Sequence, residues 1–454
     1  MAAPNLGGGR VQEMSNLKTL EPKALGFWMC VALVVGNMIG SGVFMLPASL
    51  APYGWNAVVG WVLTIGGALC LAFVFARLAK AFPQGGGPYI YTQKAFGPAA
   101  GFMVAWSYWI SLWVGNAAIA TGTVSYLSVF FPQIATVPGL HGAITVAMVW
   151  GLTGLNCYGA RSAGRLQVVT TILKLMPLLA VMVLAFVVLA KTGGSTVTPL
   201  RMADLSAVGI TSAATLTLWA LLGLESATVP ADKVHDPERT IPRATLVGTA
   251  FTGVIYLVVC SAVVLLTPAG MLTGSNAPFA DFVGLYGGGD LRLVLAGFAA
   301  ISAFGALNGW VLLQGELPYA MAKGGVFPAF LAKTSKRGTP VRAHILSSSL
   351  LTVLVLINYT KSMAELFTFI ALLATAASLF TYLFCALAAL RLQMRGRMDA
   401  SVVLTVVAIV AALYACWTLY GAGSQATLWG VVLLLIGLPI HLLMKRVAVT
   451  TAGE

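Results

Sequence analysis

The sequence predicts an all-α polytopic membrane protein with twelve transmembrane helices. Of its 454 residues, 59% are hydrophobic and only 9% are charged, whereas a soluble domain carries roughly 25% charged residues. The apolar residues form twelve runs, and eleven of them reach or exceed the length of about 20 residues that crosses roughly 30 Å of hydrocarbon. This composition excludes a soluble enzyme and a nucleic-acid-binding protein, so no nucleic-acid partner is expected.

The twelve predicted spans follow one another along the chain. They lie at 26–52, 56–82, 99–131, 140–158, 164–190, 206–231, 243–267, 291–322, 343–358, 364–391, 400–420 and 425–444. The polar segment 1–25 has no apolar core or small-residue cleavage site, which indicates a cytoplasmic tail rather than a signal peptide. The segment 445–454 is predicted to be a second cytoplasmic tail. The six cysteines lack metal-ligand spacing, so we expect no disulfide, metal or cofactor.

The basic residues fix the predicted orientation. With the N-terminus inside, 21 of the 26 Lys and Arg residues fall in inner segments. The positive-inside rule therefore places both termini in the cytoplasm and the spans in the cell (inner) membrane. The same distribution explains the net charge of +13.

Two predicted spans contain residues that interrupt a helix near mid-membrane. In the first, three glycines fall within the seven residues 36–42, and glycine is a poor helix former. In the sixth, Gly223 and Glu225 interrupt the run at a corresponding depth. Glycines in membrane helices usually mark close packing, but two interruptions five spans apart favour an inverted repeat. The predicted units are two five-helix repeats and two further helices, at 26–190, 206–391 and 400–444.

Three ionisable residues lie well inside predicted spans, where a charge is costly. Glu225 is adjacent to an interruption, so it could pair with a cationic substrate, carry a proton or link substrate occupancy to gating. Glu316 is a second candidate, with a packing ion pair or a neutral acid as the alternative. Lys174 lies too deep to snorkel to an interface, which favours a gating or proton-coupling role. Trp219 and Trp310 are also deep, and could form an aromatic cage or pack in the core.

Three motifs resemble the amino acid–polyamine–organocation superfamily. They are GNMIGSGVFMLPASLAPYG (36–54), LWALLGLESATVPADKVHDPERTIPRAT (218–245) and NGWVLLQGELPYAMAKGGVFPAFLAK (308–333). Within it, the chain resembles most the bacterial arginine/agmatine antiporter group. The resemblance implies twelve helices in the LeuT-like five-plus-five inverted repeat, with helices 1 and 6 unwound at the substrate site. It also implies a possible homodimer, because relatives are often dimers.

The resemblance also implies a substrate site. Ser41 and Gly42 would hold the α-carboxylate, while carbonyls at Met38, Trp219 and Leu222 would lie near the α-amine. Tyr108 would be a gate element, Asn116 would reach the substrate head group, and Glu225 would match the acid of the family's G-x-E-S-A motif. The implied substrate-binding residues are Asn37, Met38, Ile39, Ser41, Gly42, Tyr108, Ser111, Leu112, Asn116, Trp219, Leu222 and Trp310.

Two departures from the antiporter pattern leave the substrate open. The segment 369–373 lacks the serine that helps to bind a guanidinium in the arginine antiporter. Lys174 stands where that antiporter is apolar, and a lysine there resembles proton-coupled permeases, many of which carry neutral amino acids. We therefore expect a secondary antiporter that exchanges a basic amino acid for its amine, such as agmatine, or for another amino acid. The alternative is a proton-coupled or exchange transporter of neutral amino acids.

Two other classes of protein are disfavoured. An intramembrane enzyme is not expected, because the chain has no H-E-x-x-H or G-x-S-x-G motif. A channel is disfavoured because the mid-membrane acids are single and do not form a ring. The expected partners are therefore a small amino acid or amine and the lipid bilayer.

Overall fold

The computed structural model describes residues 25–83, 86–158, 160–228, 231 and 234–451, and it gives no side-chain description for 160–172 and 445–451. The tail predicted at 1–25 thus lies outside the described residues except for Leu25. The helices are α2 (Phe27–Met38), α3 (Ser41–Leu50), α4 (Trp55–Ala81), α5 (Pro88–Phe96), α6 (Pro98–Leu127), α7 (Gln133–Thr136), α8 (Leu140–Tyr158), α9 (Ala160–Thr192), α10 (Ala207–Leu221), α11 (Pro237–Leu266), α12 (Ala269–Leu272), α13 (Pro278–Gly287), α14 (Gly289–Lys323), α15 (Val341–Ile357), α16 (Met363–Met394), α17 (Val402–Gly421) and α18 (Gly423–Thr451).

The all-helical membrane fold is confirmed, but the count of twelve spans is not. In the described part of the chain, ten helices are long and apolar enough to cross a membrane, and the bent pair α2–α3 makes an eleventh candidate. The ninth predicted span, 343–358, corresponds to α15, which has 17 residues. At 1.5 Å per residue it is roughly 25 Å long, less than the hydrocarbon thickness. The division into two repeats stays a prediction.

The first predicted interruption is a break between two short helices. α2 ends at Met38 and α3 begins at Ser41, and the two axes differ in direction by 41°. Between them, Ile39 (φ −76°, ψ 101°) and Gly40 (φ −140°, ψ −153°) are extended. The clustered glycines explain this, because each weakens the helix by about 1 kcal/mol relative to alanine.

The second predicted interruption also ends a helix. α10 ends at Leu221, and Gly223 then takes a φ of +99°, a conformation that costs a residue with a side chain roughly 1–2 kcal/mol. A single 3-10 turn, Ser226–Thr228, follows. The prediction that the first and sixth spans are broken is therefore confirmed.

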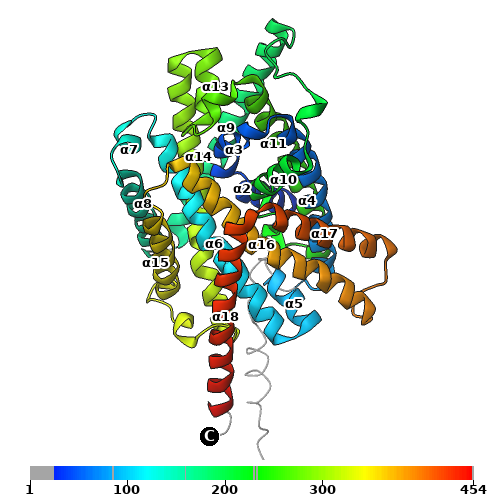
Figure 1. The fold of residues 1–454 in the computed structure, drawn as a ribbon. Helices are drawn as coiled ribbons and strands as arrows, with labels where there is room; N and C mark the ends of the chain where they lie inside the picture. Colours follow the sequence, from blue (N-terminus) through cyan, green and yellow to red (C-terminus); the bar gives the residue numbers. More distant parts are fainter. Residues whose placement is uncertain (1–24, 84–85, 159, 229–230, 232–233, 452–454) are drawn as a thin grey trace, which may run out of the picture.

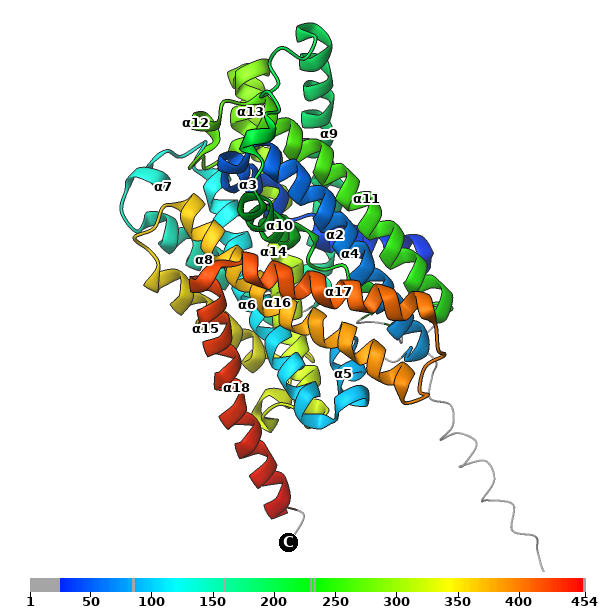
Figure 2. The same cartoon turned by 45° about the vertical axis from the view of Figure 1, so that its right-hand side comes forward.

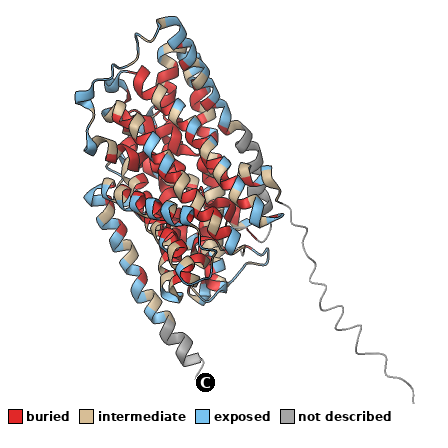
Figure 3. Cartoon of the chain, turned by 90° about the vertical axis from the view of Figure 1, so that its right-hand side faces the viewer, coloured by how far each residue is buried: buried red, intermediate tan, exposed pale blue. Residues whose placement is uncertain are grey.

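The two breaks lie against a central helix. In the 18-residue stretch of α6 that best fits a membrane span, 89% is buried inside the bundle. α6 packs against α3, α14, α15 and α16. α17 and α18 lie on the outside of the bundle (Figures 1 and 2). Buried residues gather in the middle of the bundle and exposed ones on α18 (Figure 3), whose best span segment is only 11% buried. Its exposed side chains include Leu428, Leu435 and Leu442, as expected for a helix that faces lipid.

Short helices in the connections were not predicted. α5 and α13 each fill part of a loop, and the third span ends earlier than predicted, with α6 ending at Leu127. α13 buries Phe279 against Phe44 of α3, with ring centroids 5.4 Å apart. Its Phe279 backbone N–H donates to Tyr126 Oη of α6 at 3.2 Å. α13 therefore packs against α3, the helix that follows the first break.

Candidate functional site

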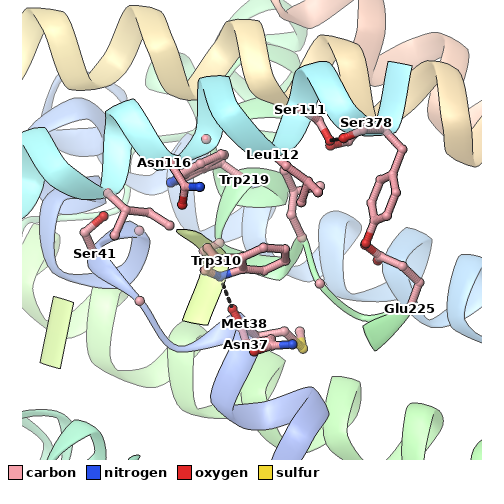
Figure 4. Close-up of a pocket in the computed structure, with 18 residues that line it drawn as sticks. Asn37, Met38, Ser41, Ser111, Leu112, Asn116, Trp219, Glu225, Trp310 and Ser378 are labelled. Atoms are coloured by element: carbon pink, nitrogen blue, oxygen red, sulfur yellow. Dashed lines mark hydrogen bonds between the residues drawn. The ribbon is translucent and has the colours of Figure 1, made fainter. Parts of the chain in front are cut away.

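A small cavity lies between the two helix breaks (Figure 4). α6 supplies one wall, the two breaks supply others, and α14 and α16 complete it. The predicted residues that line it are Asn37, Met38, Ser41, Gly42, Tyr108, Ser111, Leu112, Asn116, Trp219, Leu222, Glu225 and Trp310. Its volume is about 50 Å³, which is room for a few water molecules, since roughly 10–15 Å³ of such space holds one. The site is therefore narrow in this structure.

Three predicted residues are not part of this lining. Ile39 and Lys174 line a separate cavity of about 320 Å³ beside α2, α9 and α11. Glu316 is half-buried on α14 and does not line either cavity. The extended backbone at the break explains the position of Ile39, because successive side chains of an extended segment point to opposite sides.

Several lining residues were not predicted. Gly115 and Ile119 continue the stripe on α6 that begins at Tyr108, and a spacing of three or four residues places them on that face. This periodicity could have identified them. Ser378 on α16 also lines the cavity, and the apolar sequence around it carries no signal of that role.

One end of the cavity is the N-terminus of α3. The first N–H groups of a helix have no partner within it, and they carry the positive end of its dipole. Ser41 is fully buried, and its Oγ has no hydrogen-bond partner in the described part of the chain. Gly42 leaves room for the Trp219 indole, because a β-carbon there would lie 3.0 Å from Trp219 Nε1. This end of the cavity is suited to a carboxylate.

Two tryptophans narrow the cavity. The Trp219 ring lies between Gly42 and Gly115, where a β-carbon at position 115 would be 3.2 Å from the ring. Trp310 lies over Gly223, where a β-carbon would be 3.1 Å from its ring. The Trp310 Nε1–H donates to the Asn37 carbonyl at 3.2 Å (Figure 4). Each indole therefore occupies space that is open only because the residue beside it is a glycine.

Glu225 ties three elements together at the other end of the cavity. The residue is 1% exposed, and its carboxyl group accepts hydrogen bonds from two tyrosines. Tyr108 Oη of α6 donates to Oε1 at 2.9 Å, and Tyr382 Oη of α16 donates to Oε2 at 2.6 Å. The ion pairs found among the described residues, Arg239–Asp236 and Arg292–Asp281, do not include it. The two tyrosine hydroxyls are therefore its side-chain hydrogen-bond partners, and Tyr382 is a functional candidate that the sequence did not reveal.

Three successive carbonyls at the first break each accept a bond from a different helix. Lys174 Nζ of α9 donates to Gly36 O at 2.8 Å. Trp310 Nε1 of α14 donates to Asn37 O, and Tyr256 Oη of α11 donates to Met38 O at 2.9 Å. The Met38 carbonyl, which was expected near a substrate amine, thus already has one donor in this structure. Lys174 is 1% exposed and supports the break from outside the cavity.

Asn116 joins the cavity to the interior of the bundle. It is fully buried, and its Nδ2 donates to Gln314 Oε1 of α14 at 2.7 Å. Its Oδ1 has no donor among the residues that the structure describes. Asn116 therefore offers a free acceptor to the cavity that it lines. The sequence pattern had pointed to Asn116 but not to Gln314.

A comparison with known proteins identifies the family. The family model described as amino acid permease matches residues 25–442. A cadaverine/lysine antiporter of Escherichia coli (strain K12) is 34% identical over 336 residues, which is 74% of this chain and 75% of the relative. The putrescine transporter PotE of Haemophilus influenzae is 32% identical over 424 residues, 92% of this chain and 96% of the relative. A Bacillus subtilis (strain 168) protein, provisionally named an arginine/ornithine antiporter, is 33% identical over 405 residues, 83% of this chain and 86% of the relative. The chain therefore belongs to the amino acid permease family of the amino acid–polyamine–organocation superfamily.

Proposed function

We propose that this permease is an antiporter that exchanges a basic amino acid for its amine, or for another amino acid, by alternating access. The observation that carries the proposal is the chemical polarity of the cavity. One end presents the N-terminus of α3 at Ser41 and Gly42, and the rest offers acceptors at Asn116 and Glu225. An amino acid with a cationic side chain matches both features. The names of the relatives, which concern lysine, cadaverine, putrescine and arginine/ornithine, support the same substrate class.

The same proposal gives each residue a role. The α-carboxylate binds the N–H groups at the start of α3, and the two tryptophans enclose the aliphatic part of the side chain. Asn116 accepts a hydrogen bond from the cationic end. Glu225 holds Tyr108 and Tyr382 together, which closes one side of the site. In the orientation predicted from the basic residues, that side faces the cytoplasm.

We also propose where the protein lies in the cell and how it is oriented. We place it in the inner membrane of a bacterial cell, with both termini in the cytoplasm, from the distribution of Lys and Arg along the chain. A homodimer is part of this proposal, because the resemblance implies it. The protein is a transporter rather than an enzyme in this proposal, so its substrates leave the site chemically unchanged.

A second candidate function is proton-coupled or exchange transport of neutral amino acids. The observation that favours it is the contact of Lys174 Nζ with Gly36 O at 2.8 Å. A buried ammonium is costly without strong partners, so gain or loss of its proton would change how α9 holds the first break. In that case, proton movement at Lys174 would drive the change in access.

Uptake into proteoliposomes separates the two functions. Vesicles are loaded with arginine, lysine, agmatine, cadaverine, alanine or buffer alone, and uptake of labelled lysine and arginine is measured at acidic and at neutral pH. Uptake that requires a cationic compound inside supports the antiporter. Uptake of lysine or arginine into empty vesicles driven by a pH gradient contradicts it. Uptake of labelled alanine without uptake of lysine or arginine also contradicts it and supports the second candidate.

The recovered compounds provide a control. Mass spectrometry of the vesicle contents is expected to find the imported amino acid unchanged, with outward movement of the internal compound in proportion to uptake. A chemically altered product would contradict transport as the activity. A steady current without any internal counter-substrate would indicate a channel.

A further inference from the structure

A row of buried polar side chains runs from the cavity into the bundle. It begins at Asn116 of α6, passes through Gln314 of α14 and Ser348 of α15, and ends at Thr153 of α8. The exposed fraction is 0% for the first three and 2% for Thr153. The three links measure 2.7, 2.9 and 2.7 Å in that order. Four helices are therefore joined by one chain of hydrogen bonds.

The directions of the protons in this chain follow from the bond that Thr153 makes at its far end. Thr153 Oγ1 donates to the Val149 carbonyl at 2.8 Å, and a hydroxyl has one proton to donate. Either oxygen could be the donor in the hydrogen bond between Ser348 and Thr153; with the Thr153 proton on the Val149 carbonyl, this bond takes the proton of Ser348. Ser348 Oγ consequently has no proton left for Gln314, so it accepts from Gln314 Nε2.

The same constraint sets the orientation of the two amides. With Gln314 Nε2 directed at Ser348, the Gln314 Oε1 faces Asn116 and needs a donor, which is Asn116 Nδ2. Reversing the Asn116 amide would place two oxygens against each other. Asn116 Oδ1 is thus held as the acceptor that remains, buried and without a donor in the described part of the chain.

We propose that Gln314, supported by Ser348 and Thr153, is a positioning residue that makes Asn116 an obligate hydrogen-bond acceptor for the substrate side chain. The consequence is selection for substrates whose side chain ends in N–H groups, an ammonium or a guanidinium, over substrates of the same length that end in a methyl group. This inference rests on the proposed function, because it concerns how the same cavity chooses among amino acids.

The selection differs from the one that Glu225 provides. A carboxylate attracts any nearby cation, whereas an amide oxygen forms a hydrogen bond only with a donor that points at it. An apolar substrate side chain would leave the buried Asn116 oxygen without a hydrogen-bond partner. The free-energy cost of leaving a buried acceptor unpaired accounts for much of the preference for a polar ligand over an apolar one. If Gln314 did not fix the amide, Asn116 could turn its NH₂ group to the cavity and lose this preference.

The test is competition between lysine and norleucine, which has the same carbon chain without the side-chain amine. Each displaces labelled lysine from the purified full-length protein, and the readout is the ratio of the two affinities. Gln314→Leu and Ser348→Ala are expected to lower the lysine preference about tenfold, the effect of losing one oriented hydrogen bond to a charged group. A loss of packing alone would weaken both ligands and leave the ratio unchanged.

Ser347→Ala is the matched control. Ser347 is adjacent on α15 and equally buried, but its Oγ donates to the Gln314 backbone carbonyl and accepts from Trp109 Nε1. It takes no part in the amide chain, so its variant should keep the wild-type ratio. Thermal unfolding of each variant shows that it is folded, and Ser348→Ala provides the test if Gln314→Leu does not fold.

The outcomes separate this inference from the proposed function. A wild-type protein that prefers lysine, with both variants at the wild-type ratio, would overturn the role of Gln314 and leave the antiporter proposal intact. An equal loss of preference in the Ser347→Ala control would also overturn it. A wild-type protein that binds neither lysine nor arginine would instead overturn the proposed function.

Discussion

Replacing Gly42 with alanine tests the carboxylate end of the cavity with a single methyl group. The new β-carbon would lie 3.0 Å from Trp219 Nε1, 3.2 Å from Trp219 Cδ1 and 3.4 Å from Ala220 Cα. Optimal contacts between carbon atoms are about 3.5–4.0 Å, so the indole would have to move by a few tenths of an ångström. Its opposite edge lies against Gly115, which limits that movement.

The size of the effect follows from this crowding. An added methyl group in a packed interior costs about 1–3 kcal/mol, so we expect Gly42→Ala to weaken lysine binding roughly fivefold to 150-fold, at about 1.4 kcal/mol per factor of ten. Cadaverine, which lacks the carboxylate, should lose less affinity than lysine. The loss for lysine should include impaired access to the N–H groups at the start of α3.

Displacement of labelled lysine from the purified protein measures both affinities. Gly66→Ala is the control, because a β-carbon on that glycine of α4 meets nothing within 4 Å. A folded Gly42→Ala protein with wild-type affinity for lysine would refute the placement of the carboxylate. An equal loss for lysine and cadaverine would show that the methyl group acts only by displacing Trp219.

Three further predictions concern the buried ionisable groups and their partners. Glu225→Gln should weaken lysine and arginine more than alanine and leucine in competition binding, because it removes a negative charge; an equal loss for all four would indicate a structural role. Tyr382→Phe removes a 2.6 Å bond to that carboxyl group, so it should lower the free energy of unfolding by about 1.5–3 kcal/mol and speed exchange by loosening the closed side; slower exchange at unchanged stability would contradict this. Lys174→Ala leaves the Gly36 carbonyl without its 2.8 Å donor, so it should reduce or uncouple transport; proteoliposome exchange equal to wild type at every pH tested would remove Lys174 from the mechanism.

The sequence predicted the breaks because their cause is local. Three glycines between positions 36 and 42 lower helix propensity wherever the helix packs, and the chain does leave the helix at Ile39 and Gly40. The stripe on α6 was partly predictable for a similar reason, since a fixed helical period carries Tyr108 to Asn116 on one face. α15 was located correctly but its 17 residues make it shorter than the other predicted spans that are single helices.

The tertiary partners could not be predicted in this way. Tyr382 is 157 positions from Glu225, and Gln314 is 198 positions from Asn116. Both lie on long helices that are apolar on most sides, where periodicity does not show which face turns inward. Ile39 was expected among the substrate-binding residues, but the extended backbone at the break places it on a separate cavity, which Lys174 of α9 also lines.

The three carbonyls at positions 36 to 38 have a consequence for how this protein can change over evolution. Each is bound by a side chain from a different helix, Lys174 of α9, Trp310 of α14 and Tyr256 of α11. A protein that loses one of these side chains still has two hydrogen bonds that hold the unwound segment. A second substitution then removes one of the two bonds that remain. The effects of the substitutions should therefore be more than additive, so their order of appearance would decide which intermediates remain functional. New substrate preferences would then arise more readily on Asn116 and its neighbours than at the joint on which all three helices converge.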